Sequence, residues 1–212
     1  MKKATVIVLV LILTAIGIKA MGPHKIVGQI YDLVSWQKPV SDLKETKKIL
    51  LSLKDNKIKN LAKHIYQRDG YKKKFNNLIK IKVSVVDRYR FIVGKHRIND
   101  FLCRDNNIKH TPFQTYAVIN PLILKKIFLI EKKIKKGGIV ITSGHRTPHY
   151  NNSLDGAAKN SRHLFGTAVD IIPVDGLTKK ELRKIIRTVE KENPSLKGYN
   201  KIYDMHVHTD VR

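Results

Sequence analysis

The sequence is short of cysteine. Cys103 is the only one among 212 residues, so no intramolecular disulfide can form and the fold does not depend on an oxidising compartment. A reactive thiol needs an exposed, electropositive environment. Cys103 instead follows Asp100-Phe101-Leu102, a mostly apolar stretch, which favours a buried packing residue over a nucleophile.

Acidic residues are also scarce, and the imbalance is large. The chain has 17 Asp and Glu against 42 Lys and Arg, a formal net charge of +25. Such a surface attracts polyanions, which include nucleic acid, anionic lipid and anionic cell-wall polymers. No nucleic-acid recognition motif accompanies the charge, so we expect no specific nucleic-acid partner. A richness in Lys, Ile and Asn is also typical of AT-rich coding sequence, which offers a compositional explanation. The sequence does not indicate the oligomeric state.

An apolar run lies close to the N-terminus. Lys2 and Lys3 precede an uncharged stretch over residues 4–18, and Ala20 follows it as a candidate for the last residue before a cleavage site. This is the layout of a secretory signal, and the run is shorter than the ~20 residues of a membrane span. We expect residues 1–20 to be a signal peptide or an uncleaved signal anchor, which would tether the protein to the membrane through residues 4–18. The protein is then exported, to the periplasm or the extracellular space. A buried N-terminal helix is the alternative.

The rest of the chain divides into two regions by character. Residues 21–94 are basic and carry no motif with chemistry, and they predict an accessory region or spacer. Helical spacing is found over residues 43–53 and 58–65, and strand alternation over 79–85. Clearer signals of helix ends, strands and candidate ligands begin near residue 95. The chain's hydrophobic fraction of 42% is that of a globular protein.

Residues 95–212 predict alternating helices and strands. Asn120 and Pro121 begin a helix that ends at Gly137-Gly138. Thr178 and Glu181 form a capping box for a second helix that runs to about residue 192. Strands are expected over residues 139–142, 168–174 and 205–211, with a loop over 143–166. This order predicts a compact α+β domain.

Potential metal ligands gather in this domain. His163 and Asp170 lie seven residues apart, and His206, His208 and Asp210 should share one face of the last strand. A catalytic zinc takes three protein ligands and keeps one position open, and two histidines with one carboxylate are a common set. His163, Asp170 and His208 can supply that set.

Two further side chains fit such a site. His206 can donate a proton to an oxyanion or a leaving group, and Arg146 is a fixed cation suited to a substrate carboxylate or carbonyl. From spacing alone, ordinary surface or core histidines remain an alternative.

Several of these segments occur in the order of a known family. They are Ser143-Gly144-His145-Arg146-Thr147-Pro148, Asn151, Gly156-Ala157, the segment from Ser161 to Ile171 (SRHLFGTAVDI) and the closing His206 to Arg212 (HVHTDVR). Together with residues 96–105 they resemble the zinc D-Ala-D-Ala carboxypeptidase family, within the lysostaphin, D-Ala-D-Ala metallopeptidase and hedgehog group. The resemblance spans roughly residues 95–212.

The resemblance implies a fold and a set of roles. The fold is a small antiparallel sheet with flanking helices, with one zinc ion per chain in a groove over the sheet. The positions that match the zinc ligands are His163, Asp170 and His208. Arg146 matches an arginine that holds substrate, Ser161 a serine that contacts the peptide, and His206 a histidine beside the metal that is not a ligand.

The sequence departs from the family at two positions. His145 stands where an aromatic residue is common and can tune the cleft. Met205 stands where many members carry the acidic general base, three residues before the last ligand. Asp204, re-aimed by a β-bulge, and His206 are the two candidates for that role.

The function predicted is zinc-dependent hydrolysis of amide bonds in the stem or cross-link peptides of peptidoglycan. Both a D-Ala-D-Ala carboxypeptidase and an endopeptidase are compatible with it. Anionic cell-wall polymers are further partners that the basic charge fits. The alternative is a non-catalytic, zinc-containing cell-wall-binding module. Its support is Met205, which replaces the acidic general base of many family members.

Overall fold

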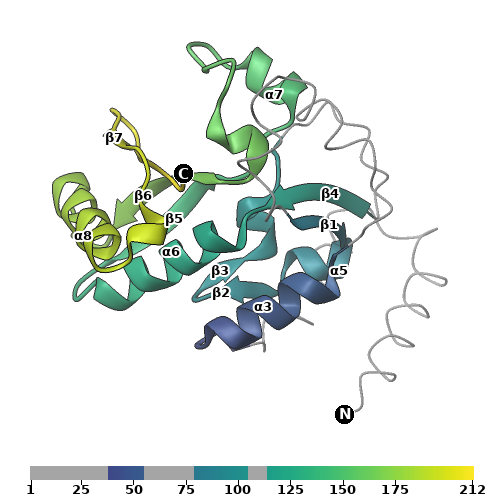
Figure 1. The fold of residues 1–212 in the computed structure, drawn as a ribbon, viewed down its shortest axis with the longest axis horizontal. Helices are drawn as coiled ribbons and strands as arrows, with labels where there is room; N and C mark the ends of the chain where they lie inside the picture. The colour runs from purple at the N-terminus through teal and green to yellow at the C-terminus, as the bar shows by residue number, and fades with distance from the viewer. Residues whose placement is uncertain (1–37, 55–78, 105–113) are drawn as a thin grey trace, which may run out of the picture. The chain divides into compact units, whose positions relative to one another are not determined.

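The computed structural model describes residues 38–54, 79–104 and 114–212 (Figure 1). The predicted signal segment over residues 1–20, with its tether over 4–18, lies outside these residues, as does the helix predicted at 58–65. Within the described ranges no helix combines the length and the apolar character that a membrane crossing requires.

The central element is a four-stranded antiparallel sheet. Its strands are β5 (Gly138–Ser143), β6 (Ala168–Val174), β7 (Asn200–Ile202) and β8 (Val207–Asp210), in the order β5-β6-β8-β7. Every neighbouring pair runs antiparallel. The prediction of an α+β fold with a small antiparallel sheet is therefore confirmed. The last strand begins at Val207, two residues later than predicted, because the preceding residues form the turn of the β7–β8 hairpin.

Two helices cover one face of this sheet, α6 (Pro121–Lys133) and α8 (Lys179–Glu192), and they lie side by side in Figure 1. Both start as predicted. Asn120 caps α6 by accepting from the backbone N–H of Leu122 at 2.9 Å, and Thr178 with Glu181 forms the capping box of α8. The helices bury an apolar side against sheet residues that include Val169, Ile171 and Val207. Because side chains alternate along a strand, the intervening Asp170 and His208 face the other side of the sheet.

Shorter elements complete the fold. Two-stranded antiparallel sheets join β1 (Ile79–Ser84) to β4 (Gln114–Ile119) and β2 (Phe91–Val93) to β3 (His96–Arg97). The remaining helices of the described residues are α3 (Leu43–Ser52), α5 (Val85–Arg88), α7 (Pro148–Ser153) and the 3-10 turns η1 (Ile98–Phe101), η2 (Arg162–Phe165) and η3 (Pro194–Leu196).

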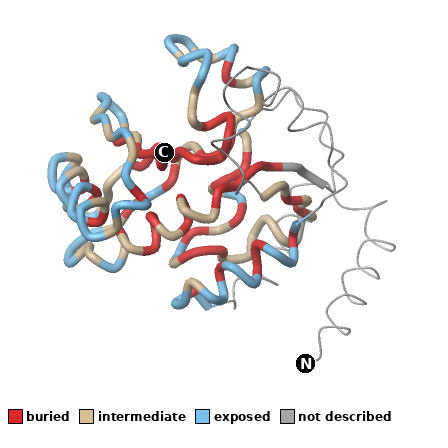
Figure 2. The backbone as a smooth tube through the Cα atoms, in the orientation of Figure 1, coloured by how far each residue is buried: buried red, intermediate tan, exposed pale blue. Residues whose placement is uncertain are grey.

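One hydrophobic core runs through the described residues (Figure 2). Leu50 of α3, Ile81 of β1 and Ile92 of β2 are buried in the same cluster as Ile127 of α6 and Ile186 of α8. Segments before residue 95 thus pack against segments after it. The division into residues 1–20, 21–94 and 95–212 stays a prediction.

The segment over residues 143–166, predicted as a loop, contains two short helical elements, α7 and η2. Gly166 ends η2 with φ +60°, and a Cβ there would lie 1.9 Å from the carbonyl oxygen of Val118. Its own carbonyl accepts from the backbone N–H of Asn120 at 3.0 Å. Only glycine fits this close approach, which fixes η2 against the end of β4.

Candidate metal centre

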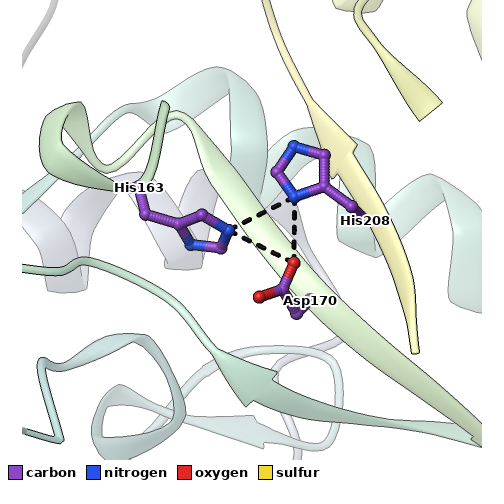
Figure 3. A group of neighbouring side chains, drawn as sticks. All are labelled: His163, Asp170 and His208. Atoms are coloured by element: carbon purple, nitrogen blue, oxygen red, sulfur yellow. Dashed lines mark hydrogen bonds and ion pairs between the residues drawn. The ribbon is translucent and has the colours of Figure 1, made fainter. Parts of the chain in front are cut away.

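Three predicted ligands converge at one point over the sheet (Figure 3). Asp170 Oδ1 lies 3.2 Å from His163 Nε2 and 2.9 Å from His208 Nδ1. The two ring nitrogens are 3.3 Å apart. His163 and Asp170 are buried, and His208 is partly buried.

The sheet register produces this meeting. Asp170 of β6 and His208 of β8 are direct partners across an antiparallel pair, so their side chains leave the same face at the same level. His163 comes from η2, whose first turn is capped by Ser161 Oγ accepting from the His163 backbone N–H at 3.4 Å. Its side chain thereby reaches the two strand residues.

A backbone carbonyl orients the His163 ring. His163 Nδ1 lies 2.7 Å from the carbonyl oxygen of Gly144. A carbonyl only accepts, so Nδ1 carries the hydrogen and Nε2 presents a lone pair to the centre. Gly144 itself is pressed against the chain, because a Cβ on it would lie 2.5 Å from Cα of Phe101.

A second carboxylate lies behind His208. Asp210 Oδ2 is 3.9 Å from His208 Nε2, and Asp210 is 1% exposed. Its Oδ1 accepts from the backbone N–H of Tyr199 at 2.6 Å. Below it, the buried Lys126 donates to the carbonyl oxygen of Asp210 and to Glu190 Oε1, both at 2.6 Å. This buried network holds the strand that carries His208.

The site favours an ionised Asp170. Burial by itself raises the pKa of a carboxyl, but the contacts with His163 and His208 and the charge of Arg146 outweigh it and hold the pKa of Asp170 well below its usual range. Burial lowers the pKa of His163, with Asp170 opposing it. For His208 burial also lowers the pKa, but Asp170 and Asp210 prevail and raise it above 6.5.

The residues fit a zinc ion. Two ligands about 2.0–2.1 Å from a tetrahedral zinc lie about 3.3 Å from each other, and the three separations here are 2.9, 3.2 and 3.3 Å. The lone pair of His163 Nε2 also faces the carboxylate of Asp170, an arrangement that needs a cation or a proton between them. Two imidazole nitrogens and one carboxylate oxygen are a ligand set of catalytic zinc sites.

Arg146 contacts the centre through Asp170. Its Nη2 donates to Asp170 Oδ2 at 2.5 Å and its Nε donates to Ser143 Oγ at 3.0 Å. The Arg146 side chain is 14% exposed, so a small part of it reaches the cleft. The structure thus brings Arg146 to the site, where it orients the oxygen of Asp170 that faces away from the histidines.

The two candidates for proton transfer lie in different places. His206 Nε2 is 3.4 Å from Asp170 Oδ1, and the ring stacks on Tyr203 with centroids 4.8 Å apart. Asp204 is exposed in the turn of the β7–β8 hairpin, and its carbonyl oxygen accepts from Lys179 Nζ. Of the two, only His206 is among the residues that line the cleft.

The triangle opens into a cleft of about 640 Å³. Ser161 and Arg146 line it, as the sequence predicted, beside residues to which the sequence assigned no role. Those residues include Tyr199, Tyr203 and Arg212. The signal that could have found Tyr199 and Tyr203 is a hairpin that ends in the last strand. Such a hairpin brings the residues before its turn next to His208.

His145 is not a residue of the cleft wall. It is 3% exposed, and neither ring nitrogen has a hydrogen-bond partner in the part of the chain that the structure describes. Burial, with a smaller effect of His163, lowers the pKa of His145 to about 4, so the ring is neutral. Tuning of the cleft by His145, which the sequence suggested, would therefore act through packing and not through contact with a ligand in the cleft.

Comparison with known proteins gives one family. A family model described as Peptidase M15 matches residues 95–210, which contain all three converging side chains. No curated protein and no solved structure matches the chain.

Proposed function

The chain belongs to the peptidase M15 family, and from this premise we propose that it is a zinc-dependent peptidase that hydrolyses amide bonds in the stem or cross-link peptides of peptidoglycan. The observation that carries the proposal is the triangle of His163 Nε2, Asp170 Oδ1 and His208 Nδ1 at the edge lengths of a zinc tetrahedron. It opens into a cleft in which a peptide can reach the fourth position.

The protein's own groups prepare the site. Bound zinc would supply a Lewis acid that polarises the scissile carbonyl and lowers the pKa of a water molecule to about 7. His163, Asp170 and His208 would hold the ion. The carbonyl of Gly144 accepts from His163 Nδ1 and orients that ring, and a hydrogen-bond partner behind a ligand raises the basicity of the ligand. The carboxylate of Asp210 lies 3.9 Å from His208 Nε2 and places a negative charge behind that ring.

His206 is the group proposed to move the proton. Burial lowers its pKa, so the ring is neutral near pH 7 and can accept a proton from the attacking water. It can then deliver that proton to the leaving amine. Stacking on Tyr203 limits the ring's rotation, which keeps Nε2 directed at the centre.

Substrate is held by polar groups around the cleft. Arg146 carries a fixed positive charge beside Asp170, and Arg212, whose side chain is 53% exposed, extends a second one over the Tyr199 ring. Either guanidinium can hold a terminal carboxylate or an internal carbonyl, so carboxypeptidase and endopeptidase activity are both covered by the proposal. The Ser161 hydroxyl lines the same cleft and is proposed to contact the peptide.

Export is part of the proposal, because peptidoglycan lies outside the cytoplasmic membrane. It is supported by Lys2 and Lys3 followed by the apolar run over residues 4–18. Cell fractionation with sequencing of the mature N-terminus tests it. A new terminus near residue 21 means a cleaved signal, an intact one in the membrane fraction means a tether, and recovery in the cytoplasm contradicts export.

The experiment that tests the function is digestion of purified peptidoglycan fragments by the zinc-loaded protein, followed by mass spectrometry. We expect fragments whose masses sum to that of the parent plus one water, and none after chelation. Full zinc loading without any cleavage would instead support the non-catalytic cell-wall-binding module.

A further inference from the structure

The outer face of α8 carries a groove lined almost wholly by cations. It has a volume of about 360 Å³, and no acidic residue lines it. Its basic residues are Lys180, Arg183, Lys184, Arg187 and Lys191. We propose that this groove, the α8 groove, binds a linear phosphodiester polyanion, such as an anionic polymer of the cell wall.

The helix keeps these charges together at a cost to its own stability. The basic residues of the groove form pairs three or four residues apart (180/183, 180/184, 183/187, 184/187 and 187/191), which places them on one side of the helix. Like charges at these spacings repel and destabilise a helix. A bound anion would reduce this repulsion and would therefore stabilise the helix.

The acids of α8 do not neutralise the groove, because each is engaged elsewhere. The contacts are Glu181 Oε2 with Thr178 Oγ1 at 2.7 Å, Glu190 Oε1 with Lys126 Nζ at 2.6 Å, and Glu192 Oε1 with Lys133 Nζ at 2.8 Å. The exposed cations of the groove, Lys180, Lys184, Arg187 and Lys191, are thus not neutralised by these acids.

The extent of the groove favours a polymer over a single anion. From Lys180 to Lys191 the helix advances about 16 Å, since each residue adds about 1.5 Å. One phosphate cannot contact both ends, whereas phosphates repeated along a chain can. Two arginines add the planar, forked donors that match phosphate oxygens.

The composition of the face disfavours a membrane surface. Helices that lie in a bilayer interface place large apolar side chains beside their lysines. Among the described residues the exposed large hydrophobic side chains are Leu51, Val140, Tyr199, Tyr203 and Met205, and none belongs to α8. Figure 2 shows exposed residues along the outer side of α8, and the exposed residues of this helix are charged apart from Thr188.

The groove lies next to the catalytic cleft. Ile202 of β7 lines the groove, and the following residue, Tyr203, lines the cleft. A polymer held along α8 therefore runs beside the hairpin that carries His206. Binding at this place would keep the protein on a polyanionic wall while the cleft samples neighbouring peptides.

The test measures binding of the full chain to poly(glycerol phosphate) by titration at low and moderate salt. Lys184→Glu/Arg187→Glu reverses two exposed charges of the groove, and Lys44→Glu/Lys48→Glu makes the same net change on exposed positions of α3. We expect the first variant to bind at least about tenfold more weakly and the second to change by less than about twofold, with affinity falling steeply with salt. Circular dichroism melting checks that both variants remain folded.

Other outcomes overturn the proposal. Equal weakening by both pairs means that net charge alone acts, and no binding by the wild type removes the site. Vesicles with anionic lipid and duplex DNA serve as rival probes, and α8-dependent binding that is tighter to either one assigns the groove to a membrane or to nucleic acid. Binding needs no turnover, so a protein without peptidase activity leaves this result intact.

Discussion

Asp170 and His208 face each other directly across two neighbouring antiparallel strands, with Asp170 Oδ1 2.9 Å from His208 Nδ1. Their side chains point away from the helices, while Val169 and Val207 on the same strands enter the core. Core packing therefore fixes the register that brings the two candidate ligands together, since a slip of one residue would turn every side chain to the opposite face.

Removing a ligand should remove the metal. His163→Ala and His208→Ala each remove one of the three donor atoms of the triangle. We expect zinc affinity to fall by more than the roughly 10–100-fold that is typical of losing a residue that only hydrogen-bonds a ligand. Zinc per chain after dialysis, measured by elemental analysis, checks this. His149→Ala, an exposed histidine on α7, is the matched control and should keep its zinc. Equal zinc in all variants would refute the ligand assignment.

Two variants can distinguish which of His206 and Asp204 transfers the proton. His206→Gln should retain zinc and lose about 10²–10⁴-fold in kcat, as expected for a general acid–base residue. Asp204→Asn should stay close to the wild-type rate, because Asp204 lies in the exposed turn and outside the cleft lining. Peptide hydrolysis rates across pH check both variants. A slow Asp204→Asn beside a normal His206→Gln would reverse the assignment.

Gly144 should be needed to orient His163. In Gly144→Ala the new methyl group would meet the backbone of Phe101 at 2.5 Å, which displaces the carbonyl that accepts from His163 Nδ1. Zinc affinity is expected to fall by about 10–100-fold. Gly138→Ala is the control, since its nearest contact is an ordinary 3.5 Å to a methyl group of Val174. Similar zinc affinities in the two variants, by competition with a chelator, would contradict the role of Gly144.

The buried pair of Lys126 and Glu190 should stabilise the fold under the site. The Lys126 side chain is 0% exposed and that of Glu190 10%. Lys126→Met leaves the Glu190 carboxylate without its ion-pair partner, bonded to Gly198 N and Asn200 Nδ2 alone, and should lower the free energy of unfolding by about 3–5 kcal/mol. Lys126→Met/Glu190→Gln removes both charges and should recover part of that loss. Urea unfolding measures both variants, and a loss below about 1 kcal/mol in the single variant would show that the pair contributes little.

Zinc binding should weaken as the pH falls. Asp170 and Asp210 raise the pKa of His208 above 6.5, so below that pKa the metal-free site holds a proton at His208 that zinc must displace. Affinity is therefore expected to be constant well above that pKa and to decrease below it. Asp210→Asn removes one of the two groups that raise the pKa and should move the decrease to lower pH. Competition titrations at about pH 8, 7 and 6 measure this, and an affinity independent of pH would contradict it.

Local patterns predicted most of the elements that carry the site. The capping residues Asn120 and Thr178 marked α6 and α8, and alternation marked β1, because these effects depend on neighbours in sequence. The spacing of His163 and Asp170 suggested a metal, and the surrounding motifs gave the complete set. The contacts of Lys126 with Glu190 and Asp210 join residues 64 and 84 positions apart, and no local pattern encodes such a meeting.

The turn before β8 was harder to predict for a similar reason. The alternation of residues 205–211 continues through Met205 and His206, so the pattern alone extends the strand too far. The end of pairing is set by the partner strand β7, which stops at Ile202. The consequence is functional, because the turn leaves Asp204 exposed while His206 still reaches Asp170.

The central claim is that hydrolysis depends on a metal held by His163, Asp170 and His208. The most direct measurement is the release of new amino groups from purified peptidoglycan peptides, with zinc content determined on the same samples of wild type, His208→Ala and His149→Ala. The account predicts that zinc and hydrolysis are lost together in His208→Ala, are both retained in His149→Ala, and return to chelated wild type when zinc is added back. Hydrolysis by His208→Ala at the wild-type rate, or by wild type after complete chelation, would contradict it.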